Sequence, residues 1–520
     1  MKGQLAEGWE AVAKRLEQLA LAEPQNPRSL LPLAQAHLRL SNTEQAMNVL
    51  ARLLALDPNH SEAIDMLSDL CTAGTRPKDI SGSAINRLIA LYPDIIALHS
   101  VAIQLCRKVD ERAERMKHLE AIYHHGVKGA DFYTEYAAML SYNGQYERCI
   151  EICEEALKAY PDSPGPYRVR ASMHGVKGEN EQALACWAKV LELKPGDIQA
   201  RMLTGQIKLL LSDGKDGFED YAAVRDRVFY QCMCNTSIPE WSGQPLAGKH
   251  LLLWCNEGIG DAFMFAGLLP WLFAQGAQVT LALYPKLIPL FARSFPNVSV
   301  VPHTPETPQL AQQLFDRYTN KCDFQLAMSQ LMRLALPHYT PSQHPPYLKA
   351  DSPRVRTLRE KYLALSQGQR KKLVGISWHS KNNDNSSQRN IPLSDWAPLF
   401  SLPHVRYISL QYSPPAGEME AANRAFPGAL YADPDIDGFQ NIDGLAAQIA
   451  ACDEVVSIQN TTVHMAGALG VKTTIMLSAA SDWRWGLVRT DSRWYTSVTV
   501  ERQETLMDWL PVLLRVARRL

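Results

Sequence analysis

Proline recurs at a near-constant spacing through the first 200 residues, and this period constrains the fold more than any other feature. The prolines stand 34, 35, 68 and 34 residues apart, where 68 is two periods of 34: Pro24, Pro58, Pro93, Pro161 and Pro195. The residue twelve positions before each of these prolines is in most cases small: Val12, Ala46, Ser81, Cys149 and Ala183. Such a period predicts stacked helical hairpins, because a single hairpin cannot bury its apolar face alone.

This pattern resembles the tetratricopeptide repeat, a helix-turn-helix hairpin. Its clearest copies repeat the same residue classes at the same spacing: Tyr133, Ala137, Gly144, Cys149 and Pro161, then Tyr167, Ala171, Gly178, Ala183 and Pro195. The resemblance implies an all-α superhelix of about six hairpins over residues 1–230, with a concave face that usually binds peptide or protein. Cys149 and Cys153 fall at packed positions of the repeat, so we expect core packing there rather than a metal site.

The pattern changes near residue 238 to short apolar runs separated by Gly, Pro and Asn turns, which predicts an α/β region. The first runs read as strand, helix and strand, a βαβ unit that implies a parallel sheet: Leu251–Trp254, Phe263–Gln275 and Gln278–Leu283. A second strand series follows: Lys372–Trp378, Arg406–Gln411, Glu454–Ile458 and Thr473–Leu477. We therefore expect two Rossmann-like halves at 238–345 and 372–500, a linker at 346–371 and a C-terminal helix at 501–520.

Three polar motifs follow predicted strands, where ligands of parallel sheets bind, so we expect an active site in the cleft between the halves. In the first motif, Gly258 and Gly260 permit a tight turn and close backbone approach. Asp261 follows them, and its carboxylate could take a proton from an attacking hydroxyl. The alternative is that Asp261 only caps the helix that comes next.

The second motif opens a predicted helix. Asn460, Thr461 and Thr462 present polar side chains and backbone N–H groups at the helix N-terminus, an arrangement that suits a diphosphate. The alternative is an ordinary Asn or Thr cap with His464 packed inward.

The third motif is the polar loop after Trp378. Lys381 and Arg389 could neutralise a departing phosphate, and the alternative is a solvated surface loop. His379 and His464 remain alternative candidate bases, because an unperturbed histidine titrates near neutral pH.

Together the three motifs resemble the GT-B glycosyltransferases, and within them the ADP-heptose:lipopolysaccharide heptosyltransferase-like enzymes, from about Glu240 to the chain end. The likeness is closer still to bacterial proteins that join tetratricopeptide repeats to this module. The likeness to the heptosyltransferase-like enzymes is carried by Gly258–Asp261 and Asn460–His464. The likeness to the repeat-bearing proteins is carried by three further segments: Trp241–Gly248, Trp483–Gly486 and Trp494–Gln503. One departure leaves the donor sugar open: Gln459-Asn460 stands where the heptosyltransferase pattern usually has Asp-Thr.

The resemblance implies inverting transfer from a nucleotide sugar without an obligatory metal or other cofactor. Asp261 would be the general base, and Asn460–His464 with Lys381 and Arg389 would hold the diphosphate. The repeats would dock a protein acceptor, for which flagellin is a candidate by family association. Two alternatives stay open: a lipid-linked or lipopolysaccharide acceptor, hinted at by the basic segment Arg515–Arg519, and a non-catalytic scaffold.

Composition and charge limit the partners and the cellular location that we expect for this protein. A formal net charge of −1 gives no overall attraction to nucleic acid or anionic membranes. The longest apolar run, Ala262–Ala274, has 13 residues interrupted by Pro270, whereas about 20 are needed to span a bilayer. The amino terminus lacks the apolar core of a secretory signal, so we expect a cytoplasmic protein.

Four aromatic residues near the chain end have two possible roles: Trp483, Trp485, Trp494 and Tyr495. They could stack on a ligand or pin the terminal helix across both halves, and we favour the second role.

Overall fold

The computed structural model divides into two compact units, Met1–Met173 and His174–Leu520. It describes residues 2–520 except 59, 73–77, 107–110, 127–128, 213–215, 222–236, 256, 304–307, 319–320, 366–370, 381–385 and 481. The expected boundary between repeats and α/β region, at residues 226–238, lies largely outside the described residues.

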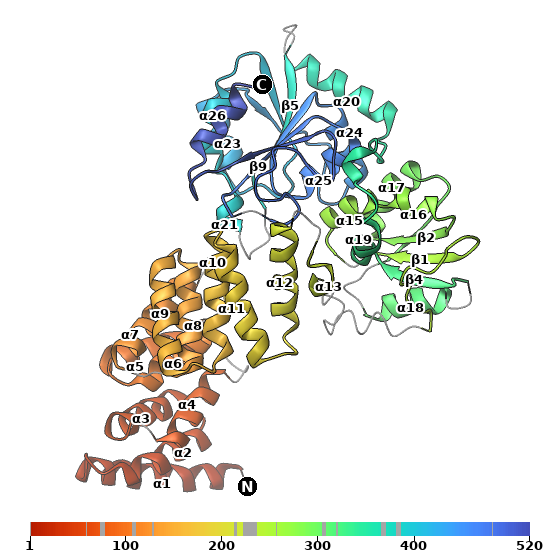
Figure 1. The fold of residues 1–520 in the computed structure, drawn as a ribbon. Helices are drawn as coiled ribbons and strands as arrows, with labels where there is room; N and C mark the ends of the chain where they lie inside the picture. Colours follow the sequence, from red (N-terminus) through yellow and green to blue (C-terminus); the bar gives the residue numbers. More distant parts are fainter. Residues whose placement is uncertain are drawn as a thin grey trace. The chain divides into compact units, whose positions relative to one another are not determined.

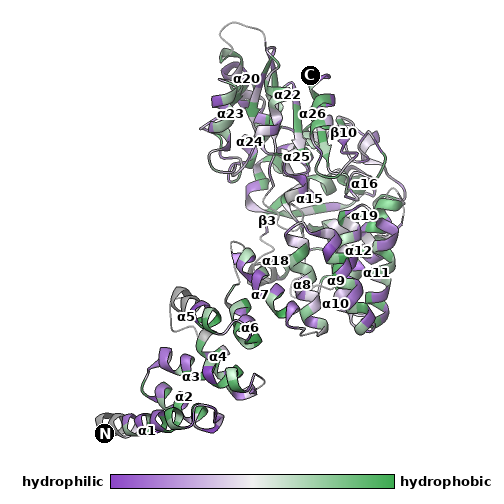
Figure 2. Cartoon of the chain, turned by 90° about the vertical axis from the view of Figure 1, so that its left-hand side faces the viewer, coloured by the Kyte–Doolittle hydropathy of each residue, from purple (hydrophilic) through white to green (hydrophobic). Residues whose placement is uncertain are grey.

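The first unit consists of helices that pair in antiparallel hairpins, as the sequence period predicts (Figure 1). They are α1 (Lys2–Ala22), α2 (Leu30–Arg39), α3 (Thr43–Leu56), α4 (Ser61–Thr72), α5 (Lys78–Leu91), α6 (Ile96–Leu105), α7 (Arg112–His124), α8 (Ala130–Tyr142), α9 (Tyr146–Ala159) and most of α10 (Pro164–Val176). Gly144 closes the α8–α9 turn with a φ of +74°, which glycine adopts without strain. The helices carry hydrophilic and hydrophobic residues together (Figure 2), as expected when one face is buried.

Among the small repeat positions, Ala46, Cys149 and Ala183 are packed core, whereas Val12 of α1 is 43% exposed. Ala46, Cys149 and Cys153 are fully buried, and Cys149 Sγ donates to the Ala137 carbonyl at 3.0 Å. The expected core role of the two cysteines is confirmed. Among the described residues, no helix combines the length and hydropathy needed to cross a membrane.

The second unit begins with helices that continue the same period: α11 (Asn180–Leu193), α12 (Ile198–Leu211) and the short α13 (Phe218–Tyr221). A parallel sheet of order β3-β2-β1-β4 follows. Its strands are β1 (His250–Trp254), β2 (Gln278–Leu283), β3 (Ser299–Pro302) and β4 (Phe324–Ala327). Alternate residues of β1 face opposite layers: Leu251 and Leu253 join one core, Leu252 and Trp254 the other.

The helix expected at Phe263–Gln275 differs from the observed structure. The chain forms α15 (Ile259–Ala266) and α16 (Leu269–Ala274), with Pro270 in the first turn of α16. Proline has no N–H to donate within a helix but is tolerated in a first turn, so the segment restarts there. The earlier start also puts Asp261 inside the first turn of α15 rather than in a loop.

The second sheet is parallel throughout, with the order β10-β9-β8-β5-β6-β7. Its strands are β5 (Lys372–Ser377), β6 (Val405–Ser409), β7 (Leu430–Tyr431), β8 (Glu454–Ile458), β9 (Thr473–Leu477) and β10 (Val498–Arg502). The strand order reverses between β5 and β8, the position where Rossmann folds bind ligands. Two Rossmann-like halves, the arrangement of the GT-B fold, are therefore confirmed.

Helices cover both faces of this second sheet (Figure 1). On one face lie α20 (Ser352–Ala364) and α24 (Ile442–Ala450), and on the other α22 (Ala397–Phe400), α23 (Glu418–Ala425) and α26 (Leu510–Ala517). The terminal helix was expected to return across both halves. Instead Val512, Leu513 and Val516 of α26 join the core of the second half, which their apolar face completes.

Gly470→Ala should destabilise the second unit more than Gly417→Ala. Gly470 ends α25 (Thr461–Leu469), and both glycines are left-handed, with φ of +77° and +76°. A methyl group at Gly470 would lie 2.3 Å from Pro346 Cγ, whereas one at Gly417 meets nothing within 4 Å. Backbone strain costs each variant about 1 kcal/mol, and the collision adds about 1–3 kcal/mol at Gly470 alone. Urea unfolding measures the difference, and equal losses would contradict tight packing at Pro346.

Candidate active site

Asn460 ties together the two central strands of the second sheet at their carboxyl ends. Its Nδ2 donates to Ser377 Oγ at the end of β5, at 2.7 Å. Its Oδ1 accepts hydrogen bonds from Ser457 Oγ of β8 at 3.1 Å and from Thr462 N at 3.0 Å, which makes Asn460 the N-cap of α25. Asn460 thereby fixes the start of α25, whose first-turn backbone N–H groups include donors without intrahelical partners.

The start of α15 in the first half lies against the start of α25 in the second. A Cβ atom at Gly260 would lie 3.3 Å from His464 Cδ2 and 3.5 Å from Thr461 Oγ1. Neither Gly258 nor Gly260 has a positive φ, so the turn itself does not require glycine. Gly260 is instead explained by the close approach of the two helices.

Asp261 is paired with an arginine from the other half. Arg484 donates to Asp261 Oδ1 through Nε at 2.9 Å and through Nη2 at 2.7 Å. The N-cap of α15 is Gly258, so the alternative in which Asp261 only caps this helix is wrong. Both side chains are largely buried, with 19% of Asp261 and 14% of Arg484 exposed.

A second carboxylate completes this cluster. Arg484 Nη1 donates to both oxygens of Asp482, at 3.1 and 3.2 Å. Burial raises the pKa of Asp482, but Arg484 and, more weakly, Arg389 lower it, and the net pKa lies below the ordinary value. Burial lowers the pKa of Arg484, yet Asp261 and Asp482 hold it well above the usual value. The guanidinium therefore stays charged between two carboxylates.

Of the two candidate phosphate-binding cations, Arg389 and Lys381, the structure describes only Arg389. Arg389 ends α21 (Ser386–Arg389), and its charge is the smallest of the effects that lower the pKa of Asp482. Lys381 lies outside the described residues. The loop after β5 is held by Gln411, whose Oε1 accepts from the backbone N–H of Trp378 at 3.0 Å and of His379 at 2.9 Å.

His464 is buried among aromatic rings. Its Nδ1 lies 2.9 Å from the Tyr495 hydroxyl, and its ring stacks on Trp485 with centroids 5.2 Å apart. Burial lowers the pKa of His464 to about 4, so the imidazole is neutral near pH 7. Gly467, one turn later, makes room for Tyr495, because a Cβ there would lie 2.5 Å from the tyrosine ring.

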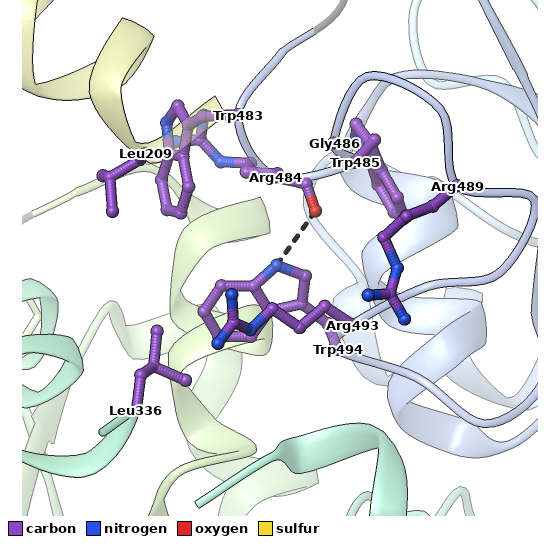
Figure 3. Close-up of a pocket in the computed structure, with 9 residues that line it drawn as sticks. All are labelled: Leu209, Leu336, Trp483, Arg484, Trp485, Gly486, Arg489, Arg493 and Trp494. Carbon is purple, nitrogen blue, oxygen red and sulfur yellow. Dashed lines mark hydrogen bonds between the residues drawn. The ribbon is translucent and has the colours of Figure 1, made fainter. Parts of the chain in front are cut away.

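The segment after β9 forms a small pocket whose lining includes three tryptophans, Trp483, Trp485 and Trp494 (Figure 3). All three are buried. Trp494 Nε1 donates to the Arg484 carbonyl at 3.0 Å, and the Arg484 guanidinium lies 4.6 Å from the centroid of Trp483. The rings thereby support the arginine that holds Asp261.

Sequence reasoning missed Arg484 and Asp482. The segment Trp483–Gly486 stood out for its tryptophans and as part of a resemblance, and nothing in its local pattern marks Arg484 as a partner of Asp261. Away from this cluster, Lys361 Nζ donates to Asp433 Oδ1 and Asp435 Oδ2, at 2.7 Å in each case.

Acid should destabilise the second unit partly through His464. The unfolded histidine has a pKa of 6.5 and the folded one about 4, so protons bind the unfolded chain preferentially between these values. The contribution of His464 to the free energy of unfolding is fully present above pH 6.5. It is lost as the pH drops towards 4, by up to about 3 kcal/mol. His303, whose pKa burial also lowers to about 4, adds to the same loss. Urea unfolding at pH 7.5 and 4.5 should show a smaller pH effect in His464→Gln than in the wild type; an equal effect would contradict this assignment.

Comparison with known proteins agrees with the repeat assignment. Residues 6–70 and 130–163 match two models of the tetratricopeptide repeat. Protein FlbA of Caulobacter vibrioides is 28% identical over 508 residues, covering 94% of this chain and 83% of that protein.

Two similar solved structures are transferases. The glycosyl transferase family 9 protein from Veillonella parvula is 12% identical, with a TM-score of 0.39 over 50% of this chain and 88% of that one. The ADP-heptose lps heptosyltransferase II of E. coli is 12% identical, with a TM-score of 0.37 over 52% and 99%. The repeat matches and the topology of the two sheets together describe a chain of tetratricopeptide repeats followed by a GT-B-like pair of Rossmann-like halves.

Proposed function

We propose that this protein is a glycosyltransferase that moves a sugar from a nucleotide sugar to a protein acceptor in the cytoplasm, with inversion and without an obligatory metal. One observation carries the proposal: a carboxylate from the first half, Asp261, is paired with Arg484 of the second half beside the N-terminus of α25. Both helices start at the carboxyl ends of their sheets, where α/β folds bind ligands. A general base and an anion site on facing halves suit transfer from a nucleoside diphosphate.

The donor diphosphate would bind at the start of α25. The N–H groups of a first helical turn lack intrahelical partners and carry partial positive charge. Arg389 and Lys381 would add full charges for the leaving diphosphate. In this scheme Asn460 holds the helix start and Thr461, half-buried beside Gly260, borders the ligand.

Asp261 would take the acceptor proton. Arg484 engages Oδ1, and no described residue donates a hydrogen bond to Oδ2. The acceptor O–H would lose its proton to Oδ2 while its oxygen bonds to the anomeric carbon. The bond from that carbon to the diphosphate oxygen breaks, and the nucleoside diphosphate leaves with the electron pair. A single displacement of this kind inverts the anomeric centre.

His464 and His379 are weaker candidates for the base. His464 is buried, and its Nδ1 lies within hydrogen-bonding distance of Tyr495, so it serves the packing between the helices. His379 lies in the loop after β5, in the half assigned to the donor.

The repeats support a protein acceptor, since stacked helical hairpins commonly bind peptides or proteins. Flagellin is the first acceptor to test, on the strength of the family resemblance. The basic C-terminal segment gives little support to a lipid acceptor, because Arg515 pairs with Glu501 at 2.8 Å and Arg519 also bonds to Glu501. These charges are occupied in holding α26 to β10.

Arg389→Ala should weaken nucleotide binding at least tenfold. Thermal shift and calorimetry with UDP, GDP, ADP and CMP identify the nucleotide, since a ligand at about 100 times its Kd adds about 2.7 kcal/mol of stability. Arg424→Ala, an exposed arginine near the end of α23, is the matched control and should bind as the wild type does. Equal affinity in all three proteins would remove Arg389 from the site, and no binding by the wild type would favour a scaffold.

Asp261→Asn should lower kcat by about 10²–10⁴-fold while nucleotide affinity is retained, because the amide cannot take the acceptor proton. Nucleotide release during transfer to flagellin measures kcat, and calorimetry measures affinity. Wild-type turnover in the variant would exclude Asp261 as the base.

A further inference from the structure

The last helices of the repeat array lie in the same compact unit as the two Rossmann-like halves. Leu209 and Leu210 of α12 and Tyr221 of α13 belong to the hydrophobic core that also contains Phe263 and Trp483. The end of the array is thus packed into the α/β module as part of its core.

Two glycines bring α13 against α12. A Cβ at Gly205 of α12 would lie 2.2 Å from Tyr221 N and 2.7 Å from Tyr221 Cα, so only glycine fits beneath this backbone. Gly217, with φ of +99°, makes the turn into α13. An ion pair also joins the two helices: Lys208 Nζ of α12 donates to Asp220 Oδ2 of α13 at 2.5 Å. Tyr221 is therefore held in one position relative to α12.

From this position Tyr221 contacts a residue next to the Asp261 cluster in each half, Glu257 in the first and Trp483 in the second. Its ring lies 5.4 Å from that of Trp483, over which the Arg484 guanidinium sits. Its hydroxyl donates to Glu257 Oε1 at 3.4 Å, in the loop that leads into α15 and Asp261. The side chain is 3% exposed. Burial, and to a smaller extent the charge of Glu257, raises the pKa of Tyr221 well above its usual value. The hydroxyl therefore stays protonated and remains a donor.

We propose that Tyr221 is a positioning residue of the candidate active site, by which the end of the repeat array orders the loop before Asp261 and the Trp483–Arg484 pair. This inference rests on the proposed function for its effect on turnover. The repeats then serve the reaction in a second way: their last helices complete the site that acts on whatever the array binds.

The test uses the full chain and three variants: Gly205→Ala, which displaces α13, Tyr221→Ala, which removes the ring, and Tyr221→Phe, which removes only the hydroxyl. Hydrogen–deuterium exchange at residues 257–266 reads out the order of the loop and α15 without any ligand. We expect exchange there to rise at least tenfold in Gly205→Ala and Tyr221→Ala, and about threefold in Tyr221→Phe. Gly196→Ala is the matched control, because a methyl group there meets nothing within 4 Å.

Turnover separates positioning from general loss of structure. Hydrolysis of the sugar nucleotide chosen by the binding screen should show kcat reduced at least tenfold in Tyr221→Ala, with the donor KM unchanged, since the donor groups lie in the second half. If Gly205→Ala does not fold, the two Tyr221 variants decide. Wild-type exchange and kcat in folded Tyr221→Ala would overturn the inference. A wild type that binds no nucleotide would refute the proposed function, and the exchange result would still judge the positioning of the loop.

Discussion

The ion pair between Asp261 and Arg484 is the interaction on which the candidate site depends. It joins residues 223 positions apart, one from each Rossmann-like half, and both are largely buried. Breaking a buried pair by removing one partner typically costs about 3–5 kcal/mol, because the other charge is left without compensation. Asp482 accepts two further hydrogen bonds from the same guanidinium within the second half, which fixes the orientation of the arginine.

The Asp261–Arg484 pair can form because the backbones of the elements around it approach one another closely. Gly260 lets α15 meet α25, and Gly467 lets α25 lie against Tyr495, whose hydroxyl contacts His464. The halves also share one apolar core, and a second polar contact joins them where Arg293 of α17 (Ile288–Ser294) pairs with Asp443 of α24. The site is thus held by packing on several sides, and the ion pair sets where the Asp261 carboxylate points.

Several parts of this arrangement could be predicted from local sequence. The proline period predicted the hairpins, and apolar runs located β1, β2, β5, β8 and β9 to within about a residue. Pro270 divides the helix that was expected after β1. This division was not predicted, because a short apolar run does not reveal where a helix restarts. The direction of the terminal helix was also missed, since its apolar face could in principle cover either half.

The sequence by itself determined the elements: a helical period near 34, parallel α/β units and polar residues at strand ends. These are local properties, carried by side chains within some 35 residues of one another. Only the tertiary structure decided that Arg484 holds Asp261, that Asn460 joins β5 to β8, and that Tyr221 reaches Glu257. Such contacts depend on how the halves and the last helices pack together, and no spacing along the chain records that geometry.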